Sequence, residues 1–221
     1  MTGADVHAVL KKAGATHLHH ANSVLTSATF LRQGGLVSRH FAEQNRLPQT
    51  PQPMSDQIDK RYRIWDGIFL DHVNIHRRAK RRNKYGPVLF EFGLDSLLKL
   101  PTGSTVGVTK LNPIYWRDAQ QPSDRWFQSA AELASRLQLG DFDKMLVIRT
   151  PTEKLDFPLG SVALKLDDPQ RNLKNGKDAY TSAIATLQAT GRSITITPHN
   201  CLPSCRCVSD YQQEDVDFFF S

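Results

Sequence analysis

The stretch from Asp71 to Phe92 reads D-H-V-N-I-H-R-R-A-K-R-R-N-K-Y-G-P-V-L-F-E-F, and it decides how the rest of the chain is interpreted. Its first part has an amphipathic pattern that indicates a helix, and six cations lie between residues 77 and 84. Tyr85-Gly86-Pro87 ends any helix, because glycine and proline interrupt regular structure. Val88 to Phe92 then predicts a short buried strand whose one charged residue is Glu91. A run of positive charge therefore directly precedes a core strand.

Positive charge at this density destabilises a fold through self-repulsion unless an anion lies against it. The alternative interpretation is a solvated surface that only keeps the protein soluble. We favour an anion site for a phosphate or a nucleic-acid backbone, because the run adjoins a core strand and no acidic residue occurs between Asp71 and Glu91. Guanidinium groups bind a pyrophosphate through paired hydrogen bonds. Those available here belong to Arg77, Arg78, Arg81 and Arg82.

The composition is that of an ordinary soluble protein, with 221 residues, 39% hydrophobic and 23% charged. This length suits one domain, and the net charge of +6 favours acidic partners such as nucleic acid. We expect no membrane association, because no apolar run approaches the roughly 20 residues of a membrane span. No secretory signal is expected either. Three cysteines do not form a disulfide framework, so we expect a cytoplasmic location.

The predicted helices and strands are mixed along the chain without the regular alternation of a doubly wound fold. Helices are predicted at 4–13, 24–33, 123–139 and 179–191, and strands at 16–20, 105–109, 144–149 and 193–197. The fold class is therefore α+β, with mixed or antiparallel sheets flanked by short helices. Residues 44–57 contain three prolines and predict a mobile surface loop that lies over a ligand. The acidic and aromatic tail, residues 212–221, is expected to pack on the domain rather than bind a partner.

Histidines are concentrated near the start of the chain, at positions 17, 19 and 20. In a strand His17 and His19 share one face, because side chains alternate with a period of two. Such a pair can bind zinc, but no further ligands lie nearby in the sequence. We favour a histidine that hydrogen-bonds a ligand, and the alternative is a core or surface histidine without a special role.

A second cluster, His199-x-Cys201-x3-Cys205-x-Cys207, contains every cysteine of the chain. Its donors suit tetrahedral zinc by type. The spacing does not, because structural zinc sites use two knuckles from separate segments and Cys205-x-Cys207 is too tight for one. We therefore expect free or partly buried thiols and no metal, with zinc held by these four residues as the alternative.

The common nucleotide motifs are absent: the sequence has neither a G-x-x-x-x-G-K-S/T loop nor a G-x-G-x-x-G turn after a strand. Several aromatic residues can stack on a base or pack in the core, and packing is the commoner role. They are Tyr62, Trp65, Trp116, Trp126 and Phe127.

The order of these features resembles the DarT-type nucleic-acid ADP-ribosyltransferases, toxins that transfer ADP-ribose from NAD to bases. Their opening motif is similar to His17-Leu18-His19-His20-Ala21-Asn22-Ser23-Val24, followed by a helix and Gly35-Leu36. Their helical Arg-Arg pair is similar to Arg77-Arg78, and their next strand to Val88–Phe92. The resemblance implies one ADP-ribosyltransferase-like domain over residues 1–221. It also implies a nucleic-acid partner, single-stranded DNA or RNA, and an antitoxin or regulatory protein.

Residue roles follow from the same resemblance. The leading histidine, His17, is expected to hold the nicotinamide half of NAD, and Arg78 inherits the catalytic role of the second arginine. The remaining implied NAD contacts are His19, Asn22, Ser23, Arg77 and Tyr85.

The sequence departs from the family at the catalytic glutamate, whose position on the strand 144–149 holds Lys144. A lysine would repel the positive charge that develops as nicotinamide leaves, whereas a carboxylate stabilises it. Asp143, one residue earlier, is the replacement that we carry forward. The alternatives are Glu132, Glu153 and Glu214, or a fold whose chemistry has changed. In the last case the chain is a basic nucleic-acid-binding module, or an NAD-using enzyme with a protein or small-molecule acceptor.

Overall fold

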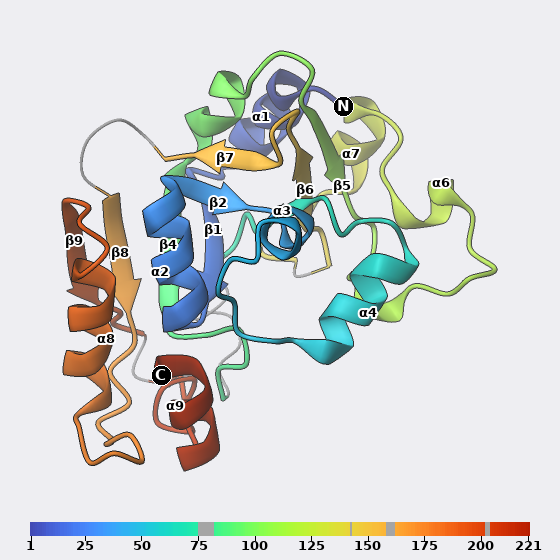
Figure 1. Ribbon diagram of the computed structural model, residues 1–221. Coiled ribbons are helices and arrows are strands. Elements are labelled where there is room, and N and C mark those ends of the chain that lie inside the picture. Colours follow the sequence, from blue (N-terminus) through green and yellow to red (C-terminus); the bar gives the residue numbers. More distant parts are fainter. Residues whose placement is uncertain (75–81, 142, 158–161, 202–203) are drawn as a thin grey trace.

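The computed structural model describes residues 1–74, 82–141, 143–157, 162–201 and 204–221 (Figure 1). The helices are α1 (Gly3–Lys12), α2 (Val24–Gln33), α3 (Arg39–Gln44), α4 (Pro53–Arg61), η1 (Leu94–Lys99), η2 (Pro113–Tyr115), α6 (Pro122–Arg125), α7 (Ala130–Arg136), α8 (Ala179–Gln188) and α9 (Gln213–Phe220). The strands are β1 (His17–Asn22), β2 (Gly35–Val37), β3 (Ile68–Leu70), β4 (Val88–Gly93), β5 (Thr105–Val108), β6 (Leu146–Arg149), β7 (Lys154–Asp156), β8 (Val162–Leu166) and β9 (Ile194–Pro198).

The strands form a four-stranded sheet in the order β1-β4-β8-β9, a three-stranded sheet β3-β6-β5 and the pair β2-β7. Neighbouring strands are antiparallel except for β8 and β9, which are parallel. An isolated bridge between His19 and Asp71 joins β1 to the end of β3 and so connects the two larger sheets. Helices mixed with largely antiparallel sheets confirm the predicted α+β class.

The two faces of β1 carry different side chains, because successive residues of a strand point to opposite sides. His20 and Asn22 lie on the face covered by α2, and the ring centroid of His20 is 5.5 Å from that of Phe30 in this helix. His17 and His19 lie on the other face, with ring centroids 6.4 Å apart. Histidines that are close in sequence are thus divided between two environments.

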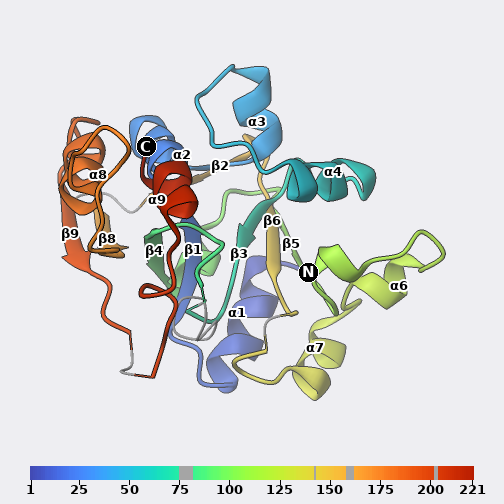
Figure 2. The same cartoon turned by 90° about the horizontal axis from the view of Figure 1, so that it is seen from below.

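Helix α2 has the boundaries that the sequence predicts. The Ser23 side chain accepts a hydrogen bond from the Thr26 amide at the first turn, and Gly34 ends the helix in the left-handed conformation at φ 75°. Helices α2, α8 and α9 contact one another on one face of the four-stranded sheet (Figures 1 and 2).

The hydrophobic core is one cluster of buried side chains drawn from α1 through to α9. Phe157 stacks on Phe90 and Phe92 of β4, with centroids 5.5 and 6.1 Å away. At the end of the chain, Val216 and Phe220 in α9 are buried in the same cluster. The acidic and aromatic tail therefore packs on the domain, as expected.

The single helix predicted over 123–139 is wrong, because α6 and α7 are separated there by an extended segment. Trp126 forms an isolated bridge with Thr109, and the Phe127 amide donates to the Val108 carbonyl at 3.0 Å. These backbone bonds pair the segment with the end of β5, which outweighs its local helical pattern. Ser129 then caps α7 as a new start.

Two further predictions for irregular or helical segments need adjustment. Residues 53–57, which the sequence assigns to a loop, form the first turns of α4, and proline at its first position suits a helix start. Asp71 lies in a bridge rather than in the amphipathic helix predicted to open the central stretch. The remainder of that predicted helix, residues 75–81, falls outside the described residues. Across the part of the chain that is described, no helix has the length and apolar character needed to cross a bilayer.

Candidate functional site

On either side of the basic segment, defined here as residues 75–82, the chain lies against β1. On one side, the His19 amide donates to the Asp71 carbonyl at 2.7 Å and the Asp71 amide donates back at 2.9 Å. On the other side, Gly86 packs so closely that an added Cβ would lie 2.2 Å from the Asn22 carbonyl carbon. Arg77 and Arg78 are among residues 75–81 and so lie outside the described residues.

This packing makes Gly86 sensitive to substitution. We expect Gly86→Ala to destabilise the fold by roughly 1–3 kcal/mol from its left-handed backbone alone, with the clash at Asn22 adding to this. Gly140→Ala is the matched control, because Gly140 has a similar φ of +95° and no described atom lies within 4 Å of a Cβ added there. Urea unfolding of both variants measures the difference. Equal losses of stability would show that the turn at Gly86 does not depend on its contact with β1.

A buried carboxylate, Asp167, anchors the residues on both sides of the basic segment. This side chain is 0% exposed and accepts hydrogen bonds of 2.8 Å from His199 Nδ1, Asn83 Nδ2 and the Tyr211 hydroxyl. His199 Nε2 in turn accepts from Asn74 Nδ2 at 3.3 Å. Burial and the adjacent Asp167 raise the pKa of Tyr211 well above its usual value, so its hydroxyl remains a donor. Asn74 precedes the basic segment and Asn83 follows it.

A carboxylate that was not predicted from the sequence as a site residue lies beside His19, on the face of the sheet that α2 does not cover. Glu91 in β4 is directly opposite His19, with 3.6 Å between Oε1 and Nδ1, and its Oε2 is 2.6 Å from Lys165 Nζ. Burial raises the pKa of Glu91, but the hydrogen bond and charge of Lys165 and the charges of His19 and His17 outweigh it. The net shift is downward, so Glu91 is ionised. The sequence signal for a functional role of Glu91 was that it is the one charged residue in an otherwise apolar strand.

Of the NAD contacts implied by the resemblance, His17 and Tyr85 are exposed and His19 is buried. Asn22 and Ser23 are also buried, and their side chains take part in the helix cap. Asn22 Oδ1 accepts from the Ser23 amide at 2.9 Å. The Ser23 hydroxyl lies 2.6 Å from that of Thr50, in the segment 45–52. These two residues therefore fix the start of α2 and hold that segment against it.

Asp143 and Lys144 lie at the same end of the strands as His17 and His19. The register that pairs His19 with Asp71 and Leu70 with Leu146 places the residues before β6 at this end. His72 Nδ1 donates to the Lys144 carbonyl at 3.2 Å, which ties the start of the central stretch to the same segment. The structure thus places Asp143, Lys144 and His72 at the same end of the strands as His17 and His19.

The charge of Lys144 is neutralised by Asp141, which follows α7 in the chain. Its Nζ lies 2.5 Å from Asp141 Oδ2, and both residues line a cavity of about 310 Å³. The other residues that line this cavity are Lys110, Phe127, Arg136 and Gln138. The ammonium is therefore held among cavity residues rather than presented alone at the position of the missing glutamate.

The alternative glutamates lie in other structural settings. Glu132 pairs with Lys110 and with Arg136 at the start of α7. Glu153 accepts hydrogen bonds from Ser38 Oγ at 2.5 Å and His40 Nδ1 at 2.9 Å. Glu214 is exposed in α9. Two of these carboxylates already have structural partners, and Asp143 is the one beside β6.

A second group of perturbed residues lies on the α2 side of β1, and the sequence analysis did not propose it. Loss of hydration lowers the pKa of His20 to about 4, so the ring is neutral. Its Nδ1 donates to the Phe69 carbonyl at 2.8 Å and its Nε2 accepts from Asn22. Arg39 is close enough to add to this shift, and it pairs with Asp56 at 3.3 Å. Groups with shifted pKa values concentrate at functional sites.

Because of Asp59 in α4, we expect the stability of the folded protein to depend on pH. Burial raises the pKa of Asp59 from 3.8 to about 7; Arg39 opposes the shift and Asp56 adds to it. The folded state holds the proton more tightly than the unfolded state, so the stabilisation is complete below pH 3.8 and is lost as the pH rises to about 7. We expect Asp59→Asn to flatten this fall in melting temperature and to be more stable than the parent above pH 7.

The control is Asp156→Asn, because the Asp156 side chain is 70% exposed. Melting temperatures of both variants and the parent, measured across this pH range, provide the comparison. Parallel pH profiles for all three proteins would contradict the assignment to Asp59.

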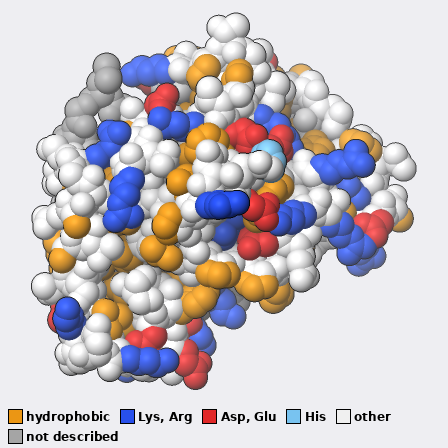
Figure 3. Space-filling model, viewed as in Figure 1, with side chains coloured by type: hydrophobic (Ala, Val, Ile, Leu, Met, Phe, Trp, Pro, Cys, Tyr) orange, Lys and Arg blue, Asp and Glu red, His pale blue; other side chains and the backbone are white. Residues whose placement is uncertain are grey.

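Three of the aromatic residues considered for base stacking contact one another. Tyr62 and Trp116 meet edge to face at 5.4 Å, as do Trp116 and Trp126 at 5.1 Å. Arg125 lies over the Tyr62 ring at 4.5 Å. This arrangement favours packing as their role. On the face shown in Figure 3, Lys and Arg side chains are spread among acidic, apolar and other residues rather than gathered in one patch.

Comparisons with known proteins give a distant similarity. No family model matches the sequence, and no curated protein does. Among solved structures, Thermus sp. 2.9 DarT in complex with ADP-ribosylated ssDNA matches with a TM-score of 0.49 and 10% identity, over 83% of this chain and 94% of that one. The same protein in complex with NAD+ matches with a TM-score of 0.42 and 11% identity, over 83% and 96%. Similarity at this level assigns no residue a role.

Proposed function

We propose that this protein is an NAD-dependent ADP-ribosyltransferase that modifies a base of single-stranded DNA or RNA. The proposal rests on the motif resemblance of residues 17–24 and 77–78 and on one structural observation that supports it. Both sides of the basic segment lie against the histidine strand, at Asp71 and at Gly86.

The proposed reaction breaks the bond between the nicotinamide nitrogen and C1′ of its ribose. The electron pair leaves with nicotinamide, a ring atom of the base bonds to C1′, and the proton lost by the base passes to solvent. Positive charge develops on the ribose in the transition state, and a nearby carboxylate stabilises it. We assign this role to Asp143. Arg78 would hold the pyrophosphate through paired hydrogen bonds, and His17, which is exposed, would contact the nicotinamide half.

The direct test incubates the purified protein with NAD and single-stranded DNA, double-stranded DNA or RNA. Mass spectrometry looks for one added ADP-ribose, and free nicotinamide is followed in the same samples. A modified oligonucleotide is the expected result. Nicotinamide release without it would move the acceptor to water, protein or a small molecule. Salt-dependent nucleic-acid binding without NAD consumption would favour the non-catalytic module instead.

The same assay locates the carboxylate. We expect Asp143→Asn to reduce transfer by roughly 10²–10³-fold, the usual effect of removing one group that stabilises transition-state charge. Asp141→Asn is the matched control, because this neighbour pairs with Lys144 in the cavity beside α7. Loss of transfer in Glu91→Gln with full activity in Asp143→Asn would instead place the carboxylate on β4, opposite His19.

A further inference from the structure

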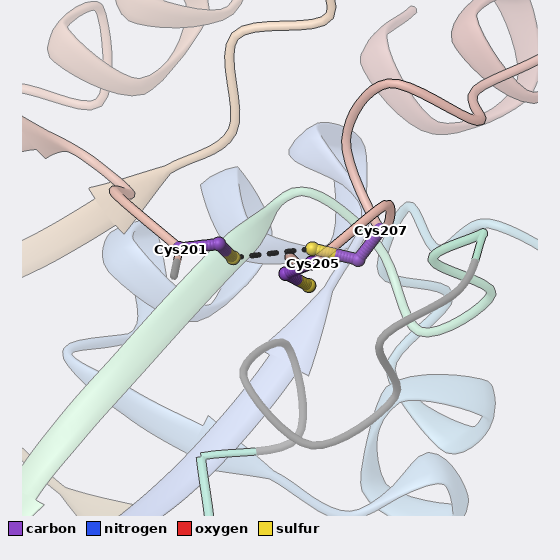
Figure 4. Close-up of side chains that lie close together, drawn as sticks. All are labelled: Cys201, Cys205 and Cys207. Carbon is purple, nitrogen blue, oxygen red and sulfur yellow. Dashed lines mark hydrogen bonds between the residues drawn. The ribbon is translucent and has the colours of Figure 1, made fainter. Parts of the chain in front are cut away.

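The three cysteines of the chain converge in space, although their spacing in the sequence fits no standard zinc knuckle. Their sulfur atoms lie within 4.8 Å of one another (Figure 4). Cys201 Sγ and Cys207 Sγ are 3.2 Å apart, and Cys207 is fully buried. Cys201 follows β9, whereas Cys205 and Cys207 belong to the turn region that leads to α9.

We propose that Cys201, Cys205 and Cys207 form a three-thiolate site for one zinc ion. Zinc–sulfur bonds of about 2.3 Å with tetrahedral angles place the sulfurs about 3.8 Å apart. The Cys201 and Cys207 sulfurs are 3.2 Å apart and all three sulfurs lie within 4.8 Å of one another, so small side-chain rotations suffice. A purely thiolate set is soft, which favours zinc over magnesium or calcium.

Metal binding here replaces sulfur–hydrogen bonds with sulfur–zinc bonds and releases the protons to solvent, so no oxidant or reductant is needed. Burial raises the pKa of Cys201 to about 11 and raises that of Cys207 further. The thiols of Cys201 and Cys207 are therefore protonated in the metal-free chain, and binding is accompanied by proton release.

His199 borders this site but has other partners. Its Nδ1 lies 3.8 Å from Cys201 Sγ and donates to Asp167 at 2.8 Å, while its Nε2 accepts from Asn74. Taking His199 as the fourth ligand would break the hydrogen bond to a fully buried carboxylate. We therefore assign the three thiolates as the protein ligands and leave the fourth position to solvent.

The position of the cluster gives the metal a structural role. The backbone amide of Asn83 donates to the Cys207 carbonyl at 3.0 Å, and the side chain of Asn74 hydrogen-bonds to His199. Residues on both sides of the basic segment thus hydrogen-bond to Cys207, a proposed metal ligand, and to His199, which borders the site. Zinc binding would fix Cys207 and the residues beside it, and with them the contacts of Asn74 and Asn83 on the two sides of the basic segment.

The test uses the full chain purified under reducing conditions from zinc-supplemented cells. Elemental analysis by mass spectrometry is expected to find one zinc per chain, and chelation is expected to lower the melting temperature. Reconstitution with Co²⁺ should give the near-ultraviolet charge-transfer band of thiolate ligands. Cys205→Ser, at a half-exposed position, should lose both zinc and this band while its circular dichroism spectrum remains that of a folded protein.

Two variants serve as controls. Ser204→Ala changes an exposed side chain in the same turn and should retain the metal, and His199→Gln should retain it if the thiolates alone are the ligands. Zinc content unaffected by Cys205→Ser would overturn the site. So would a freshly purified chain without zinc whose mass is two hydrogens below that of the reduced sequence, since that chain would hold a disulfide instead. Loss of metal in His199→Gln would overturn the three-ligand assignment.

Discussion

Replacing Asp167 with alanine is expected to lower the free energy of unfolding by roughly 2–6 kcal/mol, because the buried donors of His199 and Tyr211 lose their acceptor and each unsatisfied buried group costs about 1–3 kcal/mol. The carboxylate is 0% exposed and accepts hydrogen bonds from His199, Asn83 and Tyr211. Its removal leaves buried donors without an acceptor, and each such donor carries a desolvation penalty. Denaturant unfolding measured by circular dichroism tests this expectation.

Asp168→Ala is the control for this experiment. Asp168 is the next residue, is exposed, and makes a local hydrogen bond to the Gln170 amide at 2.9 Å. We expect its replacement to change stability by about 1 kcal/mol or less, a typical surface effect. If the two alanine variants were equally stable, the Asp167 cluster would not be a principal source of stability.

Replacing Arg78 with alanine is expected to reduce ADP-ribose transfer by roughly 10²-fold or more, because the guanidinium assigned to hold the pyrophosphate of NAD in position is lost. The melting temperature should change by only a few degrees, because a run of six cations destabilises itself. Transfer is measured with the oligonucleotide that the parent protein modifies.

Lys84→Ala provides the charge-matched control. Lys84 belongs to the same basic run and its side chain is exposed, so its loss removes one positive charge without the guanidinium. We expect Lys84→Ala to keep most of the activity, with nucleic-acid binding less dependent on salt. Full transfer by the Arg78 variant would rule out the catalytic role. Equal losses in both variants would indicate general electrostatic attraction rather than a specific phosphate contact.

The candidate site shows which features could be predicted from a local sequence motif and which could not. The sequence predicted the strand with His17 and His19 on one face, because alternation is a local property of extended chains. It grouped Asn22 and Ser23 with them, and the structure places these two in the cap of α2 and in contact with Thr50. Which groups a residue meets depends on segments that are distant in the sequence, and Thr50 gave no local signal.

The electrostatic features of the site were even harder to predict from the sequence. Asp59 and His20 have shifted pKa values because packing removes water from them and places Arg39 beside both. Glu91 is ionised beside His19 because β1 and β4 pair in one particular register. A shift of one residue in that register would move Glu91 to the opposite face. Burial and register are properties of the assembled fold.

The sequence by itself determined the local elements: Ser23 and Gly34 bound α2, and the apolar run at 88–92 forms β4. These follow from hydrogen bonds and backbone preferences within a few residues. Only the tertiary structure decided that Trp126 leaves a predicted helix to pair with Thr109, that Asp167 gathers partners from distant segments, and that the cysteines converge. The reason is that backbone pairing and burial between remote segments outweigh the smaller local preferences.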